Sequence, residues 1–131
     1  MQDKIKIIMA DDSSHILDGV SDFISDEEDM SVESKCTDGE EAIKEIENSS
    51  FDLLLLDLSM PKKNGFEVLQ TLTEKKINIP VLVFTNYAQK DFINLAKKLG
   101  ARGFLSKDGS PEELVSAIRI VYNGGTLFNN F

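Results

Sequence analysis

The hydrophobic pattern along the chain alternates between two spacings. Short apolar runs are typical of buried β-strands, and apolar residues that recur every three or four positions are typical of amphipathic helices. The runs predict strands at residues 4–10, 30–36, 51–57, 79–84 and 101–106. The helical stripes are Ile16, Leu17, Val20, Phe23 and Ile24; Ala42, Ile43 and Ile46; Phe66, Val68, Leu69 and Leu72; Phe92, Leu95, Ala96 and Leu99; and Leu114, Val115, Ile118 and Val121.

Polar residues predict where two of the helices begin. Ser110 is followed by Pro111 and Glu113, which supply a capping side chain, a proline in the first turn and an acid in the capping-box position. Thr37 and Glu40 have the same spacing and predict a second capping box.

The alternation of strands and helices predicts an α/β fold built on a parallel sheet. Right-handed crossovers place helices on both faces of such a sheet. A closed eight-fold barrel needs roughly twice this length. We therefore expect a five-stranded, doubly wound sheet with the common strand order 2-1-3-4-5. The sequence shows no internal boundary or linker, so residues 1–131 are expected to form one domain.

Composition narrows the class of protein. Hydrophobic residues make up 41% and charged residues 28%, and the net charge of -9 argues against direct nucleic-acid binding. The apolar run at 53–56 is too short to cross a bilayer, and the first residues lack the features of a secretory signal, so we expect a cytoplasmic protein without membrane contact. Cys36 is expected to be a buried strand residue, and His15 has no partner placed for transition-metal binding.

Polar side chains gather at the predicted carboxyl ends of the strands. Asp11 and Asp12 follow the first strand, Asp57 ends the third, Thr85 follows the fourth and Lys107 follows the fifth. In the 2-1-3-4-5 order the first and third strands are neighbours at the topological switch point, where such folds bind ligands. The three carboxylates should therefore meet in one crevice.

These residue types suit phosphoryl transfer. Three close carboxylates repel one another unless a cation compensates them, and oxygen ligands without Cys or His favour Mg²⁺, with Ca²⁺ or Mn²⁺ as substitutes. Lys107 adds a positive charge, Thr85 adds a hydroxyl, and Asp57 can act as the nucleophile. Each residue alone is more simply a helix cap, turn former or surface lysine. Their joint placement at one sheet edge favours function.

Together with the run DLSMPKKNG at 57–65, these residues resemble the motif set of response-regulator receiver domains, over essentially the whole chain. The resemblance implies the CheY-like, flavodoxin-like form of the predicted fold. It implies a signalling switch in a two-component system rather than an enzyme, since such a domain catalyses only its own phosphoryl transfer and autodephosphorylation. It also implies that a sensor histidine kinase or a small phosphodonor supplies the phosphoryl group.

The resemblance assigns roles to the site residues. Asp57 matches the acceptor, Asp12 matches a direct Mg²⁺ ligand, and Asp11 matches an acid that usually acts through water. The backbone carbonyl of Ser59 would complete the protein ligands.

The resemblance further implies a conformational switch. On phosphorylation Thr85 would swing toward the phosphoryl group and Phe104, three residues before the lysine, would move inward. The surface formed by the fourth helix, fifth strand and fifth helix would change as a result.

Within the family, residues 100–114 and the run NGGT at 123–126 are similar to the NarL/FixJ subfamily, whose members usually carry a helix-turn-helix DNA-binding domain after the receiver. The sequence to Phe131 leaves no room for such a domain. We expect an isolated receiver from a longer protein, because Gly124, Gly125 and Thr126 resemble the start of a connection, with a single-domain regulator as the alternative. DNA would be contacted only through an output domain absent from this chain. The amphipathic last helix allows self-association.

Four positions depart from the family pattern or tune it. Asn86 follows Thr85 where Ala, Gly or Ser is usual, and Tyr87 and Ser59 occupy positions that tune autodephosphorylation, so we expect a relatively long-lived phosphoryl group. Asp108 replaces the common proline after the lysine, which leaves the isomer of that peptide bond open.

Other classes of protein remain as alternatives. The same fold could serve as a pseudo-receiver that binds partners without phosphorylation. A haloacid-dehalogenase hydrolase also uses an aspartyl nucleophile, but its Asp-x-Asp motif would need an acid where Ser59 stands. A flavodoxin would need hydroxyl residues where Asp11 and Asp12 stand, because the acids would repel the flavin phosphate.

Overall fold

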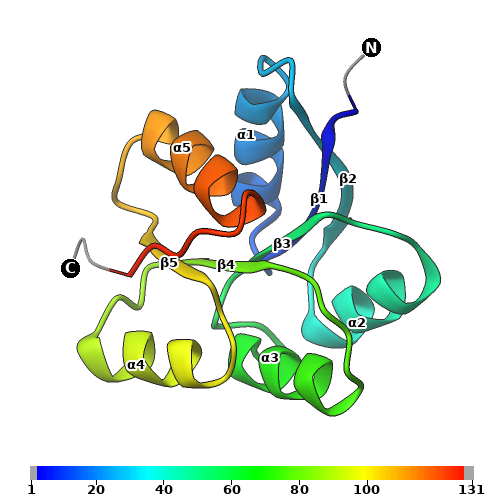
Figure 1. Ribbon diagram of the computed structural model, residues 1–131, viewed down its shortest axis with the longest axis vertical. Helices are drawn as coiled ribbons and strands as arrows, with labels where there is room; N and C mark the ends of the chain where they lie inside the picture. The colour runs from blue at the N-terminus through cyan, green and yellow to red at the C-terminus, as the bar shows by residue number, and fades with distance from the viewer. Residues whose placement is uncertain (1–2, 129–131) are drawn as a thin grey trace.

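Five parallel strands form the central sheet of the computed structural model, which describes residues 3–128 (Figure 1). The strand order is β2-β1-β3-β4-β5, as predicted. The strands are β1 (Ile5–Ala10), β2 (Met30–Cys36), β3 (Leu53–Leu56), β4 (Val81–Thr85) and β5 (Gly103–Ser106). The helices are α1 (Ser14–Ile24), α2 (Gly39–Asn48), α3 (Gly65–Glu74), α4 (Lys90–Lys98) and α5 (Pro111–Tyr122).

The helices cover both faces of the sheet. Figure 1 shows α1 and α5 on one face and α2, α3 and α4 on the other. Alternate strand residues point to opposite faces, so Leu53 and Leu55 pack with α1 and α5, whereas Leu54 and Leu56 pack beneath α2 and α3. The sheet thus separates two hydrophobic clusters, and each fully buried aliphatic side chain contributes about 1.5–3 kcal/mol.

The start of α2 differs from the prediction. The expected capping box of Thr37 and Glu40 is wrong by one residue: Asp38 is the N-cap, and its side chain accepts a hydrogen bond of 2.8 Å from the Glu41 amide. Asp38 has the extended backbone that a cap requires. Its carboxylate also lies near the positive end of the helix dipole.

Two other helices begin with clear local signals. Asn64 and Glu67 form a reciprocal capping box at α3, with both hydrogen bonds at 2.9 Å. The predicted start of α5 is confirmed, because Ser110 accepts from the Glu113 amide at 3.2 Å and Pro111 is the first helical residue. These caps fix the ends of the loops that follow β3 and β5.

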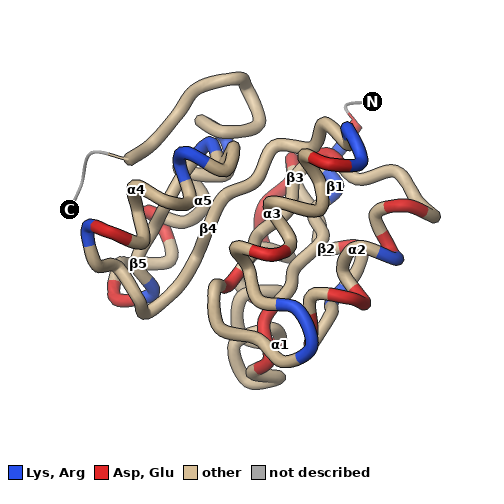
Figure 2. Tube along the Cα trace, turned by 90° about the horizontal axis from the view of Figure 1, so that it is seen from below, with Lys and Arg blue, Asp and Glu red and all other residues tan. Residues whose placement is uncertain are grey.

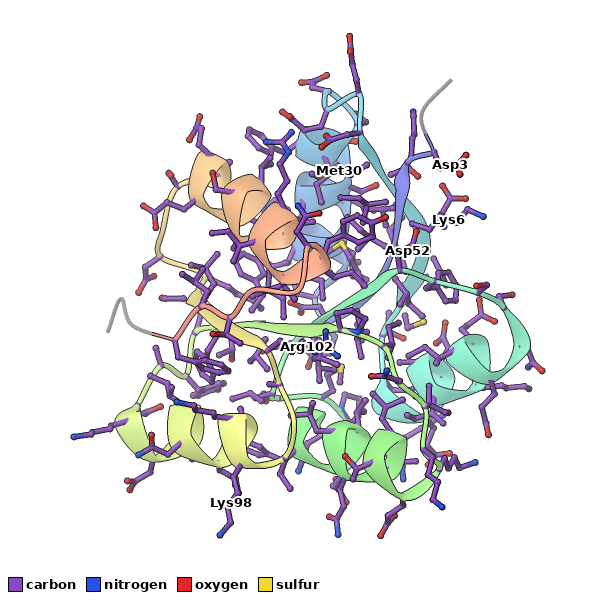
Figure 3. The ribbon with its side chains drawn as sticks, viewed as in Figure 1. Asp3, Lys6, Met30, Asp52, Lys98 and Arg102 are labelled. Atoms are coloured by element: carbon purple, nitrogen blue, oxygen red, sulfur yellow. The ribbon has the colours of Figure 1, made fainter. Side chains whose placement is uncertain are left out.

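Every strand except β2 begins one or two residues later than predicted. β3 begins at Leu53 rather than residue 51, because Asp52 is used to close the amino end of the sheet. The Asp52 amide donates to the Lys6 carbonyl, and the Lys6 amide donates to Asp52 Oδ2, both at 2.8 Å. Figure 3 shows these two residues at the same corner of the domain. At the carboxyl ends, Asp57 follows β3 directly and Thr85 is the last residue of β4.

The residues after α5 return to the sheet. Gly124 has a positive φ of 94° and turns the chain back, and Leu127 then forms a parallel bridge with Gly103 at the outer edge of β5. In the described part of the chain every peptide bond is trans, including the bond between Lys107 and Asp108. Among residues 3–128, no helix combines the length and apolar character needed to span a bilayer.

Candidate functional site

The sheet register brings the predicted acids together. Ala10 pairs with Leu56, so the residues that follow them, Asp11 and Asp57, leave adjacent strands at the same level. The Asp57 amide donates to the Ala10 carbonyl at 3.0 Å. Carboxylate oxygens of Asp11, Asp12 and Asp57 all lie within 4.8 Å of one another.

Lys107 lies between two of the acids. Its ammonium nitrogen is 2.6 Å from Asp11 Oδ2 and 3.2 Å from Asp57 Oδ2. Its backbone amide donates to the Thr85 carbonyl at 3.0 Å, which fixes the start of the side chain at the end of β5. The ammonium therefore offsets part of the negative charge of the acidic cluster.

Burial and pairing set the protonation of this cluster. Burial raises the pKa of Asp11, against the lowering effects of its hydrogen bonds to Lys107 and the Ser13 amide; the negative charge of Asp57 raises it further. Burial alone would lower the pKa of Lys107, but its hydrogen bond to Asp11 and the nearby charge of Asp57 raise it overall. Lys107 thus remains a cation at neutral pH.

Asp57 is held by backbone contacts on two sides. Its Oδ1 accepts from the Leu58 amide at 2.8 Å, while Oδ2 faces Lys107. Gly65 packs against the carbonyl oxygen of Asp57 so closely that a Cβ there would collide with it. In the sequence Gly65 stands out only as the last residue of the run at 57–65. Its contact with Asp57 depends on how the loop folds back.

Thr85 and Phe104 are both fully buried. The Thr85 hydroxyl accepts from the Tyr87 amide at 3.3 Å. Phe104 packs in the cluster beneath α2, α3 and α4. The expected movement of Phe104 on phosphorylation stays a prediction, because the structure describes one arrangement of the ring, which lies in the core.

The tuning positions are open to solvent. Ser59, Asn86 and Tyr87 are exposed, and the Tyr87 side chain is 45% accessible. Ser59 and Tyr87 line a cleft of about 380 Å³ beside Asp57, together with Phe66 and Phe92. Any group attached to Asp57 would lie next to this cleft.

The other two residues singled out by the sequence have simpler places. Cys36 is fully buried in β2, and burial raises the pKa of its thiol to about 11, which confirms the expectation of a buried strand residue. His15 is exposed on α1 and lines an apolar groove with Phe84 and Pro111. Neither residue belongs to the acidic cluster.

The donor set fits a hard divalent cation. Asp11 and Asp57 are buried, Asp12 is exposed, and all three present oxygen ligands, which Mg²⁺ prefers. Buried like charges at this distance repel one another, so a cation bound here would relieve the repulsion that Lys107 only partly offsets. The exposed side of Asp12 leaves the site open to solvent and to an incoming group.

Comparisons with known proteins converge on one family. A family model described as "Response regulator receiver domain" matches residues 7–119. The chain is 38% identical over 125 residues to the transcriptional regulatory protein CiaR of Streptococcus pneumoniae, covering 95% of this chain and 54% of that protein. It is 37% identical over 117 residues to the nitrate/nitrite response regulator protein NarL of Escherichia coli, covering 89% of this chain and 54% of that protein.

Solved structures agree in fold. The signal receiver domain of NarL from Mycobacterium tuberculosis has a TM-score of 0.89 and 27% identity, covering 93% of this chain and 98% of that chain. The response regulator domain of CheB from Thermotoga maritima has a TM-score of 0.85 and 26% identity, covering 92% of this chain and 97% of that chain. The chain spans about half the length of the two curated relatives.

Proposed function

We propose, from the premise that this chain belongs to the response regulator receiver domain family, that Asp57 accepts a phosphoryl group with the help of Mg²⁺ and so switches the state of the domain. The observation that carries the proposal is the joint position of Asp11, Asp12 and Asp57 around one point, with Lys107 between two of them. A purely structural role would not require three acids at one sheet edge. The residues 1–131 would act as one receiver unit.

In the proposed step, a carboxylate oxygen of Asp57 attacks the phosphorus of the donor. The new bond is the P–O bond of an acyl phosphate. The bond that breaks is P–N in a phosphohistidine or P–O in acetyl phosphate, and the leaving group keeps the electron pair. Lys107 offsets the negative charge that gathers on the phosphoryl oxygens, and the Thr85 hydroxyl can donate to one of them.

Asp11, Asp12 and Asp57, with the Ser59 carbonyl, are the residues that would hold the cation. When bound, Mg²⁺ supplies charge neutralisation for the transferring group. The fixed amide of Leu58, 2.8 Å from Asp57 Oδ1, holds the carboxylate in one orientation for attack.

Phosphorylation would add about 1.5 to 2 negative charges at the sheet edge. Thr85 and Phe104 are the proposed switch residues, and the surface of α4, β5 and α5 is the proposed output. Phe104 is fully buried in the structure, and phosphorylation would shift the balance between this arrangement and others that the domain already samples.

The partners follow from the family. A sensor histidine kinase would supply the phosphoryl group, and DNA would be contacted only through an output domain outside this chain. Support comes from the curated relatives, two of which are named as regulators of transcription or of the nitrate/nitrite response.

Incubation with acetyl phosphate and Mg²⁺, followed by intact mass spectrometry, tests the proposal. We expect the mass of one phosphoryl group on the parent and none on Asp57→Asn. Asp52→Asn is the matched control, because Asp52 lies at the opposite end of the same strand. A parent that gains no mass with Mg²⁺ present would refute phosphorylation. It would favour the alternative of a pseudo-receiver that binds partners without phosphorylation.

A further inference from the structure

The chain after α5 is tied to the edge strand by a pair of backbone hydrogen bonds. The Leu127 amide donates to the Arg102 carbonyl at 3.1 Å, and the Phe104 amide donates to the Leu127 carbonyl at 2.9 Å. Leu127 therefore adds one parallel position beyond β5. In Figure 1 this red segment runs beside β5, on the side where α4 and α5 flank the sheet.

Side chains on both faces hold the segment in place. Leu127 packs with the cluster beneath α1 and α5, and Phe128 packs with the cluster beneath α2, α3 and α4. The ammonium of Lys97 lies 5.4 Å from the centre of the Phe128 ring. The neighbouring Lys98 points away from the domain (Figure 3). Leu127 and Phe128, which we term the edge segment, thus contact both halves of the core.

Gly103, which forms the bridge with Leu127, is packed closely against side chains of β4 and α5. A Cβ there would press on the Leu82 and Val121 side chains, at 2.8 and 2.9 Å, and would lie 3.7 Å from the Leu127 carbonyl. The carbonyl and amide that bind the edge segment belong to the residues on either side of this glycine. The segment is also uncharged in a chain of net charge -9, and Figure 2 shows the trace after α5 without charged positions.

The same short strand leads to the phosphorylation site. Phe104, whose amide binds the edge segment, lies three residues before Lys107, which is about 10 Å along a strand. Lys107 contacts Asp11 and Asp57 directly, and its own amide is bonded to Thr85. Lys107 therefore directly follows a four-residue strand whose other side is bonded to Leu127.

We propose that the edge segment is a detachable sixth strand whose attachment to β5 is coupled to the state of Asp57. Phosphorylation stabilises the attached form, because the new charge on Asp57 holds Lys107 and fixes β5, with Phe104 inside, in the arrangement to which Leu127 binds. The signal then leaves the domain along the main chain after α5. This inference rests on the proposed phosphorylation of Asp57.

Coupling of this kind is reciprocal. If the group on Asp57 favours attachment, attachment favours the group on Asp57 by the same factor. Coupling free energies between sites typically correspond to a 5- to 150-fold change, so we expect about a fivefold effect or more in each direction.

Amide hydrogen exchange of the parent, followed by NMR with and without beryllofluoride and Mg²⁺, is the direct test. Beryllofluoride is a phosphate mimic that has been used with the isolated receiver domain of RcsB. We expect the Leu127 amide to exchange about fivefold more slowly in the complex. The Leu58 and Lys107 amide signals report independently whether the complex has formed.

The reciprocal test uses a variant. Leu127→Pro removes the donor to Arg102, and we expect it to weaken beryllofluoride binding about fivefold, whereas Thr126→Ala, at an exposed neighbouring position, leaves binding unchanged. Far-UV circular dichroism checks that both variants fold. If the proline variant does not fold, Leu127→Ala serves in its place, because it removes the side chain that packs with the cluster beneath α1 and α5.

The outcomes separate the two proposals. Unchanged or faster exchange of Leu127 in a complex that the Leu58 and Lys107 signals show to be formed overturns the coupling and leaves the phosphorylation of Asp57 intact. Failure of the complex to form in the parent overturns the proposed function and the coupling with it.

Discussion

Replacing Gly39 by alanine should disturb the site from a distance. Gly39 is the first residue of α2 and is buried. A Cβ at this position would collide with the backbone carbonyl oxygen of Lys63 and approach its Cβ to 2.8 Å. Lys63 belongs to the loop between β3 and α3, which carries Ser59 and follows Asp57. Backbone cannot rotate away as a side chain can, so this loop or the start of α2 must move.

The size of the effect follows from two opposed contributions. Forcing an extra carbon into a packed site costs about 1–3 kcal/mol. Because alanine has a higher helix propensity than glycine, the substitution also stabilises the helix by at most about 1 kcal/mol. We therefore expect Gly39→Ala to lower the free energy of unfolding by about 1–2 kcal/mol.

Gly19 provides a matched control. It lies within α1, and a Cβ there would have no neighbouring atom within 4 Å. Gly19→Ala should therefore raise the free energy of unfolding by about 0.5–1 kcal/mol. The same substitution at two helical glycines is thus expected to change the free energy of unfolding in opposite directions.

Urea unfolding followed by far-UV circular dichroism measures both variants, since the chain has no tryptophan. A second measurement is the rate of phosphorylation by acetyl phosphate, which should fall for Gly39→Ala because the loop that carries Ser59 has moved, and stay unchanged for Gly19→Ala. If Gly39→Ala is as stable as the parent and is phosphorylated at the parent rate, the proposed contact with Lys63 does not constrain the loop.

Three further changes test the electrostatics of the site and its surroundings. Asp57→Asn should raise the free energy of unfolding in EDTA by about 1 kcal/mol, because it removes a buried charge that repels two neighbouring acids and loses only one attraction; a drop in urea midpoint would contradict this. Asn86→Ala should shorten the lifetime of the phosphoryl group in excess Mg²⁺ by opening access for water, and decay no faster than the parent would remove the steric explanation. Arg119 lowers the pKa of Asp29 through a hydrogen bond of 2.9 Å, so this pair stabilises the fold above the ordinary pKa of 3.8 and loses that contribution as pH falls through the lower folded value. Thermal unfolding of Arg119→Met should accordingly show a lower midpoint than the parent at pH 7 and converge with it in strong acid; a constant difference would mean that the pair is not the cause.

The fold and the convergence of the acids could be predicted, because both depend on residue patterns that can be recognised in the sequence without knowledge of tertiary contacts. Alternating strands and helices fix a parallel sheet, and the order of such a sheet places Asp11 and Asp57 on neighbouring strands. The salt bridge from Lys107 follows from the same logic, since every parallel strand ends at one edge.

Features that depend on how two loops meet could not be predicted. Asp38 and Thr37 are both good caps, and only the backbone path decides between them. Gly39 and Lys63 lie far apart in the sequence, and no periodic pattern of residues indicates that they are in contact. Leu127 forms a bridge of a single residue, which has no alternating pattern of its own.

The place of Phe104 three residues before Lys107 could be counted along the chain, and the structure buries its ring in the core. Its movement on phosphorylation stays a prediction, because it concerns a difference between two states.

The sheet divides the core into two clusters, and this division determines how the effects of core substitutions combine. Side chains of the cluster beneath α1 and α5 contact one another, whereas those beneath α2, α3 and α4 contact a separate set. Substitutions that share no neighbour change stability independently. Libraries made for the two halves should therefore combine without interference, and a pair such as Ile118→Val with Leu72→Met should show the sum of its single effects. Epistasis should concentrate instead at the one edge of the sheet where both halves border the acids.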